Sequence, residues 1–370
     1  MTSRYPRALR QGLVSLALAA LCLAVVPSSA QETDFRRSER EAHFKVPGGP
    51  AQSVKTATAG TLGGKEVKEL TTPEQHNELG KMMAVDNDGF IWFTATREAK
   101  VVKIDPKSLA MTSFNLPRGS EPYSLDVDSK GTLWITTYPG VDRLIEFNPK
   151  NSEAISHIPP TRGMFPNVVV DRKTDTVYFS QPAANLIVSY RAGGSFKEYP
   201  IPTAQSFPGR VDIDSRGNVW FPELYGDKLG LLDPTTGKIS EWDLPSKDGV
   251  PAFCRVGKDD TIWVSMPMSD KLASFKDGQF KEYRVPTTKS IPSTSAQDAE
   301  GIVWFTEGGY RASEGGNKIG RLDPATGIIT ELPLPTPKAE PTGMLLDKNG
   351  VLWFQETKAS KIGRIALPNR

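Results

Sequence analysis

The stretch Glu340–Ile365, EPTGMLLDKNGVLWFQETKASKIGRI, contains three short apolar runs separated by polar segments. MLLD leads into the turn DKNG, VLWF follows at once, and KIGRI comes after a polar gap. An Asp at the start of a four-residue turn and a Gly at its end are typical of a type I turn. Each apolar run has the length and residue types of a β-strand. The stretch therefore predicts a small antiparallel sheet, which cannot bury both of its faces alone.

The same turn and second strand recur along most of the chain. An aromatic residue marks the second strand of each copy, and the markers are Trp92, Trp134, Tyr178, Trp220, Trp263, Trp304 and Trp353. Their spacings are 42, 44, 42, 43, 41 and 49 residues. A third strand ending in Asp-Pro or Asn-Pro and a fourth ending in Pro complete most copies. This period predicts an all-β, seven-bladed β-propeller of four-stranded antiparallel blades.

The last copy stops after its third strand, so the ring needs a fourth strand from elsewhere. Lys65–Leu70, KEVKEL, resembles the fourth strand KEYRVP of an earlier copy. We predict that this N-terminal strand pairs with Lys361–Ile365 and closes the ring. His43–Pro47, HFKVP, is the alternative. Closure of this kind removes the open edges that the first and last blades would otherwise expose.

The N-terminus has the features of a secretory signal. Three arginines in the first ten residues precede an apolar core from Gly12 to Val26, which is too short to span a bilayer comfortably. We expect residues 1–30 to be a cleaved signal peptide, 31–64 a flexible lead and 65–370 the propeller. The mature protein is then periplasmic or secreted, and Cys254 is its single cysteine, which we interpret as a buried, inert thiol.

The formal net charge is +2, and the charges form no acidic or basic block. This composition argues against a nucleic-acid partner and against binding to a charged membrane surface. Outside the signal, no stretch is apolar enough for a membrane span, and we expect a monomer. The longest spacing contains an insertion, Gly308–Gly316, which is either an element of the rim or a tolerated surface loop.

The inner strands of a propeller start at the mouth of its central channel, so residues there are candidate ligand contacts. They are Lys81, Glu121, Tyr123, Asn167, Arg210, Phe253, Ser293 and Thr342. The set combines aromatic, basic and amide groups, which suit a polar or anionic small molecule or a peptide. The alternative is a solvated channel that binds nothing.

Other repeated residues have structural explanations. The aromatic markers are expected to pack between blades, and the turn aspartates to form turns rather than calcium sites. Glu223, Glu307 and Glu356 each follow an aromatic pair by two residues. They are either exposed or ion-paired with nearby basic residues. Glu356 together with Glu340 could instead hold a hard cation, Mg²⁺ or Ca²⁺, at the channel mouth.

The repeat resembles the streptogramin B (virginiamycin B) lyase family. Trp304–Met344, WFTEGGYRASEGGNKIGRLDPATGIITELPLPTPKAEPTGM, carries nearly all of the motif, and the resemblance covers about Lys65 to Ile365. It implies a seven-bladed propeller that opens the ester of a cyclic depsipeptide by elimination. Such a carbon–oxygen lyase uses Mg²⁺ near the central channel.

The family has a histidine after the inner-strand proline in each of its last two blades, and a pair of glutamates in the last blade. Glu340 and Glu356 match the two glutamates, but Ser293 and Thr342 occupy the histidine positions. Elimination needs a general base that works near neutral pH, which imidazole provides and a hydroxyl does not. We therefore expect a module that binds a small molecule or protein rather than an active lyase, with unknown catalytic residues. A metal-dependent lyase and a lactonase-like hydrolase are the alternatives.

Overall fold

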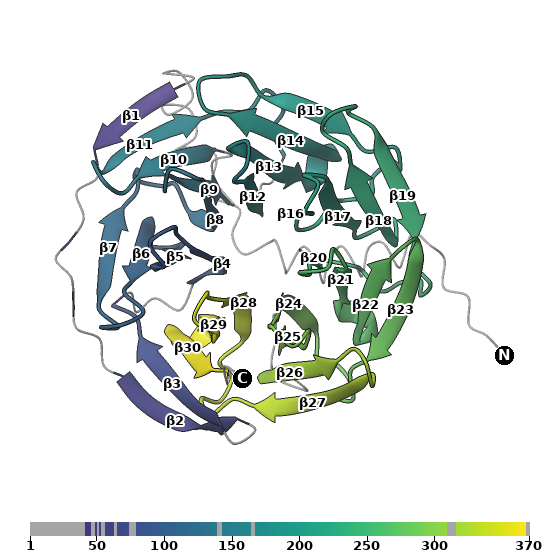
Figure 1. Cartoon of the computed structure of the whole chain (residues 1–370). Coiled ribbons are helices and arrows are strands. Elements are labelled where there is room, and N and C mark those ends of the chain that lie inside the picture. Colours follow the sequence, from purple (N-terminus) through teal and green to yellow (C-terminus); the bar gives the residue numbers. More distant parts are fainter. Residues whose placement is uncertain are drawn as a thin grey trace, which may run out of the picture. The chain divides into compact units, whose positions relative to one another are not determined.

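The computed structural model describes residues 41–45, 49, 52, 56–62, 65–73, 79–138, 143–163, 167–308 and 316–367. In the unit Glu41–Arg370 these residues form seven antiparallel sheets that follow one another around a ring (Figure 1). The predicted all-β, seven-bladed propeller is confirmed. Each blade has its first strand innermost, because strands consecutive in the chain pair outward from the centre.

The first three blades are formed by consecutive strands of the chain. Blade one contains β4 (Leu79–Val85), β5 (Ile91–Ala95), β6 (Lys100–Ile104) and β7 (Met111–Asn115). Blade two contains β8 (Pro122–Val127), β9 (Leu133–Thr137), β10 (Leu144–Asn148) and β11 (Glu153–His157). Blade three contains β12 (Val168–Asp171), β13 (Thr176–Gln181), β14 (Leu186–Arg191) and β15 (Lys197–Pro200).

The next four blades complete the ring. Blade four contains β16 (Asp212–Ile213), β17 (Val219–Glu223), β18 (Lys228–Leu232) and β19 (Ile239–Asp243). Blade five contains β20 (Phe253–Val256), β21 (Ile262–Met266), β22 (Lys271–Lys276) and β23 (Gln279–Arg284). Blade six contains β24 (Pro292–Gln297), β25 (Val303–Glu307), β26 (Lys318–Asp323) and β27 (Ile328–Pro333). Blade seven contains β28 (Pro341–Leu346), β29 (Val351–Glu356) and β30 (Lys361–Ala366), completed by strands from the N-terminal side.

The ring closes as the sequence predicts. β3 (Lys65–Thr71) runs antiparallel to β30, with Val67 opposite Ile365 and Thr71 opposite Lys361. The alternative closing segment lies elsewhere: in β1 (Glu41–Lys45), His43 is opposite Ile155 at the outer edge of blade two. The first and last blades therefore share no open edge between them.

The segment expected to be a flexible lead contains strands. β1 and β2 (Thr56–Leu62) both fall within residues 31–64, and β2 pairs with β3 at the outer edge of blade seven. An outer strand leaves one row of backbone donors and acceptors unpaired, and an added strand satisfies them. The expected signal peptide, residues 1–30, lies outside the described residues.

The aromatic markers pack between neighbouring blades, as predicted. Trp353 of blade seven is fully buried in a cluster with Phe93 and Met83 of blade one. The turn aspartates have a second role besides shaping the turn. In blade one, Asp86 accepts hydrogen bonds from the backbone of its own turn and from the indole Nε1 of Trp92, at 2.7 Å. This second bond ties the turn to the core of the blade.

The glycine of the recurring KIGR strand has a packing reason. Phe305 is paired with Gly320 on the neighbouring strand, and a Cβ atom on Gly320 would lie 2.0 Å from its ring. Gly230 and Gly363 face Phe221 and Phe354 in the same way. Only glycine leaves room for the aromatic ring.

Three short 3₁₀ turns connect second and third strands: Pro182–Ala184, Pro267–Ser269 and Thr357–Ala359. In the part of the chain that the structure describes, no helix is long and apolar enough to cross a membrane.

Candidate functional site

The predicted channel residues occupy two positions of the inner strand. Lys81, Tyr123, Ser293 and Thr342 lie five residues before the first residue of the following turn, whereas Asn167, Arg210 and Phe253 lie four residues before it. In blades one, two, six and seven, irregularities in the strand register lie next to the residues of the first group. We call the first group of residues the first layer and the second group the second layer.

The residues at the two histidine positions of the family are enclosed. Thr342 is 2% exposed, and its hydroxyl lies 2.6 Å from that of Thr357 at the end of the neighbouring strand. Ser293 is 6% exposed in the equivalent place of blade six. Both positions thus carry a small, buried hydroxyl.

Tyr123 of the first layer, and Glu121 just before it in the chain, are more exposed than Ser293 and Thr342. Tyr123 is half-buried and packs edge-on against Tyr138, with 5.8 Å between the ring centroids. Glu121 is half-buried with a φ of 43°, and its carbonyl accepts the amide of Tyr138. The side chain of Lys81 lies outside the described part of the structure.

The two glutamates of the predicted metal site have different partners. Glu340 pairs with Lys358, at 3.9 Å between Oε1 and Nζ. Glu356 is fully buried, and burial together with the carboxylate of Glu69 raises its pKa to about 8. The positive charge of Lys361 opposes this shift, because it lowers the pKa of the same carboxyl group. This raised pKa favours the protonated form of Glu356 at neutral pH. Among the described residues no group of three or more His, Cys, Asp or Glu could hold a metal ion.

Glu223 and Glu307 are equivalent to Glu356, and neither sequence-based alternative holds for them. Both are fully buried, and burial followed by the charge of Glu241 or Glu331 raises their pKa values to about 8. They are neither exposed nor ion-paired, because the neighbouring lysine of each blade binds the outer glutamate instead. Gln181 and Met266 take the same place in blades three and five, which shows that the position accommodates a neutral side chain.

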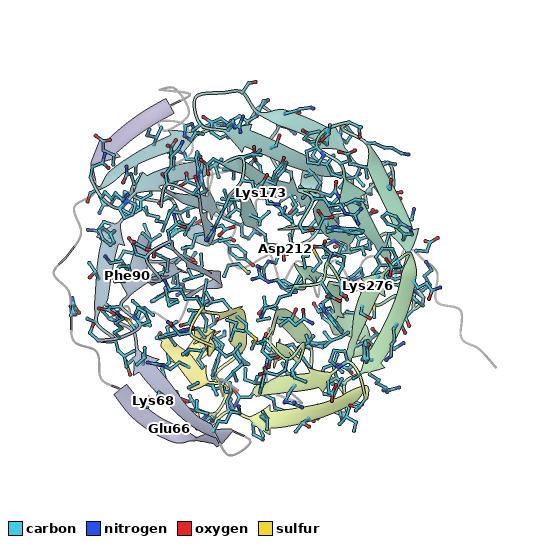
Figure 2. All side chains as sticks on the ribbon, in the orientation of Figure 1. Glu66, Lys68, Phe90, Lys173, Asp212 and Lys276 are labelled. Carbon is cyan, nitrogen blue, oxygen red and sulfur yellow. The ribbon has the colours of Figure 1, made fainter. Side chains whose placement is uncertain are left out.

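Charged residues on or next to the inner strands come from blades two to five. Burial lowers the pKa of Arg210 in blade four, and the charge of Asp126 in blade two opposes this shift. Burial raises the pKa of Asp126, and the charges of Arg172 in blade three and Arg255 in blade five oppose it. Arg172 also donates to the carbonyl of Val85 in blade one, at 2.8 Å. Figure 2 shows Asp212 of blade four near the centre of the ring.

The second layer of predicted residues contains unpaired polar atoms. Arg210 is 8% exposed, and its Nη1 has no hydrogen-bond acceptor among the described residues. Asn167, in the equivalent place of the preceding blade, is 5% exposed, and its Oδ1 has no donor there either. Phe253 follows in blade five and is half-buried. The sequence indicated these three residues. It did not indicate that one buried polar atom of Arg210 and one of Asn167 lack a hydrogen-bond partner among the described residues.

Another prediction, that Cys254 is buried, agrees with the structure. Cys254 is a free, buried thiol that donates to the carbonyl of Arg210 at 3.0 Å, and burial raises its pKa. His157 lies in the outer strand β11, between Glu146 at 3.0 Å and the hydroxyl of Tyr190 at 3.1 Å. Its ring is held away from the starts of the inner strands.

Comparison with known proteins adds the family context. The family model of the virginiamycin B lyase family matches residues 53–249 and 234–370. A virginiamycin B lyase from Nocardia farcinica (strain IFM 10152) is 28% identical over 183 residues, which are 49% of this chain and 61% of that relative. The match thus spans less than two thirds of that relative's length.

Solved structures of similar proteins have the same fold. The selenomethionine-substituted virginiamycin B lyase from Staphylococcus aureus superimposes with a TM-score of 0.73 at 24% identity, covering 82% of this chain and 99% of that one. A streptogramin B lyase structure gives a TM-score of 0.73 at 26% identity, covering 82% and 97%.

Proposed function

This chain belongs to the virginiamycin B lyase family, and we propose that it is an exported propeller that binds a polar ligand in its channel without the lyases' elimination chemistry. One observation carries the proposal: Ser293 and Thr342 stand where the family motif has its two histidines. Both hydroxyls are enclosed, and that of Thr342 is hydrogen-bonded to Thr357.

The missing imidazole matters because of the reaction. Elimination from an ester begins with removal of the proton next to a carbonyl group, and the base must be unprotonated near neutral pH. A serine or threonine hydroxyl does not accept a proton in that range. Of the three histidines of the chain, His43 lies in β1 and His157 in β11, both outer strands, and His76 lies outside the described residues. Neither of the two motif positions, Ser293 and Thr342, therefore supplies an imidazole to receive the proton.

Both glutamates of the predicted cation site have a lysine nearby. Glu356 is enclosed with Glu69 and Lys361, so an ammonium group already occupies the neighbourhood of the carboxyl. Glu340 is engaged with Lys358. A site for Mg²⁺ or Ca²⁺ at this pair stays a prediction of the sequence, and the mechanism that we propose uses no metal step.

Incubation with a streptogramin B, followed by chromatography and mass spectrometry, tests this function. We expect the cyclic compound to remain intact, with the Staphylococcus aureus lyase as the active control. A linear product of unchanged mass would show elimination and would overturn the proposal. A linear product heavier by one water would support the lactonase-like alternative instead.

Export is part of the same proposal. The apolar segment Gly12–Val26 after three arginines supports a cleaved signal, with the mature chain beginning at about Gln31. Edman or mass-spectrometric determination of the N-terminus in the extracytoplasmic fraction tests it. An intact N-terminus on protein found only in the cytoplasm would contradict export.

A further inference from the structure

We propose that Arg210 forms the centre of a carboxylate-binding site in the central channel, a step that rests on the binding function proposed above. The ligand is a monoanionic organic acid with an N–H group close to its carboxylate and an apolar substituent. N-acyl amino acids and the C-terminal residue of a peptide have this chemistry.

The backbone of Arg210 is held firmly while its side chain lacks a partner. Its amide donates to the carbonyl of Ala252 at 3.1 Å, and its carbonyl accepts the thiol of Cys254 at 3.0 Å. The guanidinium is more than nine-tenths buried, yet Nη1 has no acceptor in the described structure. A buried charged donor without an acceptor is costly, and an oxyanion placed against it would offset that cost. Burial, followed by the charge of Arg255, lowers the pKa of Arg210 to about 10, which leaves it protonated at neutral pH.

The nearby carboxylates are already satisfied by other groups. Asp212 accepts the amides of Ile213 and Val256, at 3.0 and 2.8 Å, and lies 3.7 Å from Nε of Arg255. Asp126 accepts the amides of Val127 and Val170, both at 2.8 Å, and lies 3.8 Å from Nη2 of Arg172. Neither aspartate forms a hydrogen bond with Arg210, which is the arginine that remains for a ligand.

The charge balance indicates a monoanion. With both aspartates ionised, three arginines, at 172, 210 and 255, and two aspartates, at 126 and 212, give this group a net charge of 3 − 2 = +1. One carboxylate neutralises it, whereas a phosphate dianion would leave an excess negative charge in a buried setting. Burial raises the pKa of Asp126, which leaves the group no less positive.

The two flanking residues indicate the rest of the ligand. Oδ1 of Asn167 is a buried acceptor without a donor, so a ligand N–H one blade away from the carboxylate would satisfy it. In blade five, Phe253 forms an isolated parallel β-bridge with Arg210, and its side chain is half-buried. An amide N–H and an apolar group on either side of the carboxylate therefore match this layer.

Isothermal titration calorimetry with two matched compounds tests the site. The probes are N-acetyl-L-phenylalanine and its carboxamide, which has the same shape without the charge. We expect the acid to bind on the order of tenfold more tightly, the equivalent of one charge-assisted hydrogen bond. Arg210→Gln should remove this preference, Arg210→Lys should retain part of it, and Arg284→Gln, at an exposed strand position, should leave it unchanged.

A second variant distinguishes loss of the site from loss of the fold. Asn167→Asp keeps the side-chain shape but introduces a carboxylate at the equivalent place of the preceding blade, so it should repel the acid and still bind the carboxamide. Arg210→Gln should melt no lower than the wild type, because it removes a buried charge without a partner. Equal binding of both probes, no binding of either at millimolar concentration, or an unchanged preference in Arg210→Gln would each overturn the site. Linearisation of a streptogramin B, in contrast, would overturn only the proposed absence of lyase activity.

Discussion

Nζ of Lys361 lies 2.6 Å from Oε2 of Glu69, although the two residues are 292 positions apart in the chain. The same carboxylate oxygen accepts the hydroxyl of Thr336, which follows the outer strand of blade six. We call this lysine, glutamate and hydroxyl arrangement the outer clasp. The outer clasp recurs at three other junctions. Lys228, Glu241 and Thr203 form it before blade four, and Lys271, Glu282 and Ser246 form it before blade five. Lys318, Glu331 and Thr287 form it before blade six. The N-terminal strand thus closes the ring with the contacts that join consecutive blades elsewhere.

Loss of the closing clasp should destabilise the whole ring. Glu69 is 3% exposed, so Glu69→Gln would leave Lys361 without its carboxylate in a largely enclosed place. We expect a loss of about 2 kcal/mol in the free energy of unfolding, measured by urea denaturation. Glu66→Gln, at an exposed position of the same strand, is the control and should change little.

Deletion of the closing strand should have a larger effect. A chain that begins at residue 72 lacks β3 and leaves β30 with an open edge. We expect it to melt well below the wild type and to aggregate on heating, while a chain that begins at residue 41 keeps every described strand. Equal melting temperatures for the two truncated chains would contradict the role of β3.

The buried glutamates should make the protein less stable as the pH rises. Glu307 has a folded-state pKa of about 8 against an ordinary value of 4.5, since it is buried beside Glu331 and near Asp270, with only Lys318 opposing them. The folded state therefore holds a proton that the unfolded chain has lost between these pH values. The stability that this bound proton contributes is complete below pH 4.5 and is lost as the pH rises through 8.

Glu307→Gln isolates this effect, because glutamine resembles the protonated carboxyl. We expect the variant to match the wild type in urea unfolding at pH 5 and to exceed it by on the order of 3 kcal/mol at pH 9. Glu300→Gln, at an exposed turn position, should show no such pH dependence. A variant as pH-dependent as the wild type would mean that Glu307 is ionised in the folded state.

The bond between a turn aspartate and its tryptophan should contribute measurably to stability. Oδ2 of Asp298 accepts the indole Nε1 of Trp304 at 2.8 Å, while Oδ1 accepts two turn amides. Asp298→Ala should cost about 2 kcal/mol and change the near-UV circular dichroism of the tryptophan. Asp323→Ala is the control, because the partners of that aspartate, Ala325 and Thr326, lie within its own turn. Equal losses in the two variants would show that the indole bond adds nothing.

The close approach of Gly320 to Phe305 predicts a pair of coupled variants. Gly320→Ala places a methyl group into the aromatic ring and should cost about 1–3 kcal/mol. Phe305→Leu in the same chain should recover part of this loss, because the smaller side chain frees the space above residue 320. A double variant no more stable than the additive expectation would contradict the steric explanation.

Part of the proposed channel site could be predicted from the sequence. Arg210, Asn167 and Phe253 could be named because inner-strand starts are recognisable from their distance to the following turn. Their burial could not, since it depends on how neighbouring blades tilt against one another. Glu356 shows the opposite case: the motif suggested a metal ligand, and packing places its carboxyl beside Glu69, a residue almost 300 positions away.

Local patterns were sufficient for the architecture. Most repeats carry their own turn aspartate, aromatic marker and outer proline, so the number of blades and the strand order follow from residues close together in the chain. The closing strand 65–70 was recognisable from its likeness to the fourth strand of another repeat. The protonation of Glu307 and the unpaired guanidinium of Arg210 depend instead on desolvation and on charges from other strands and blades. Those surroundings exist only once seven sheets have closed into a ring, because burial and the field at a buried site are properties of the assembled core.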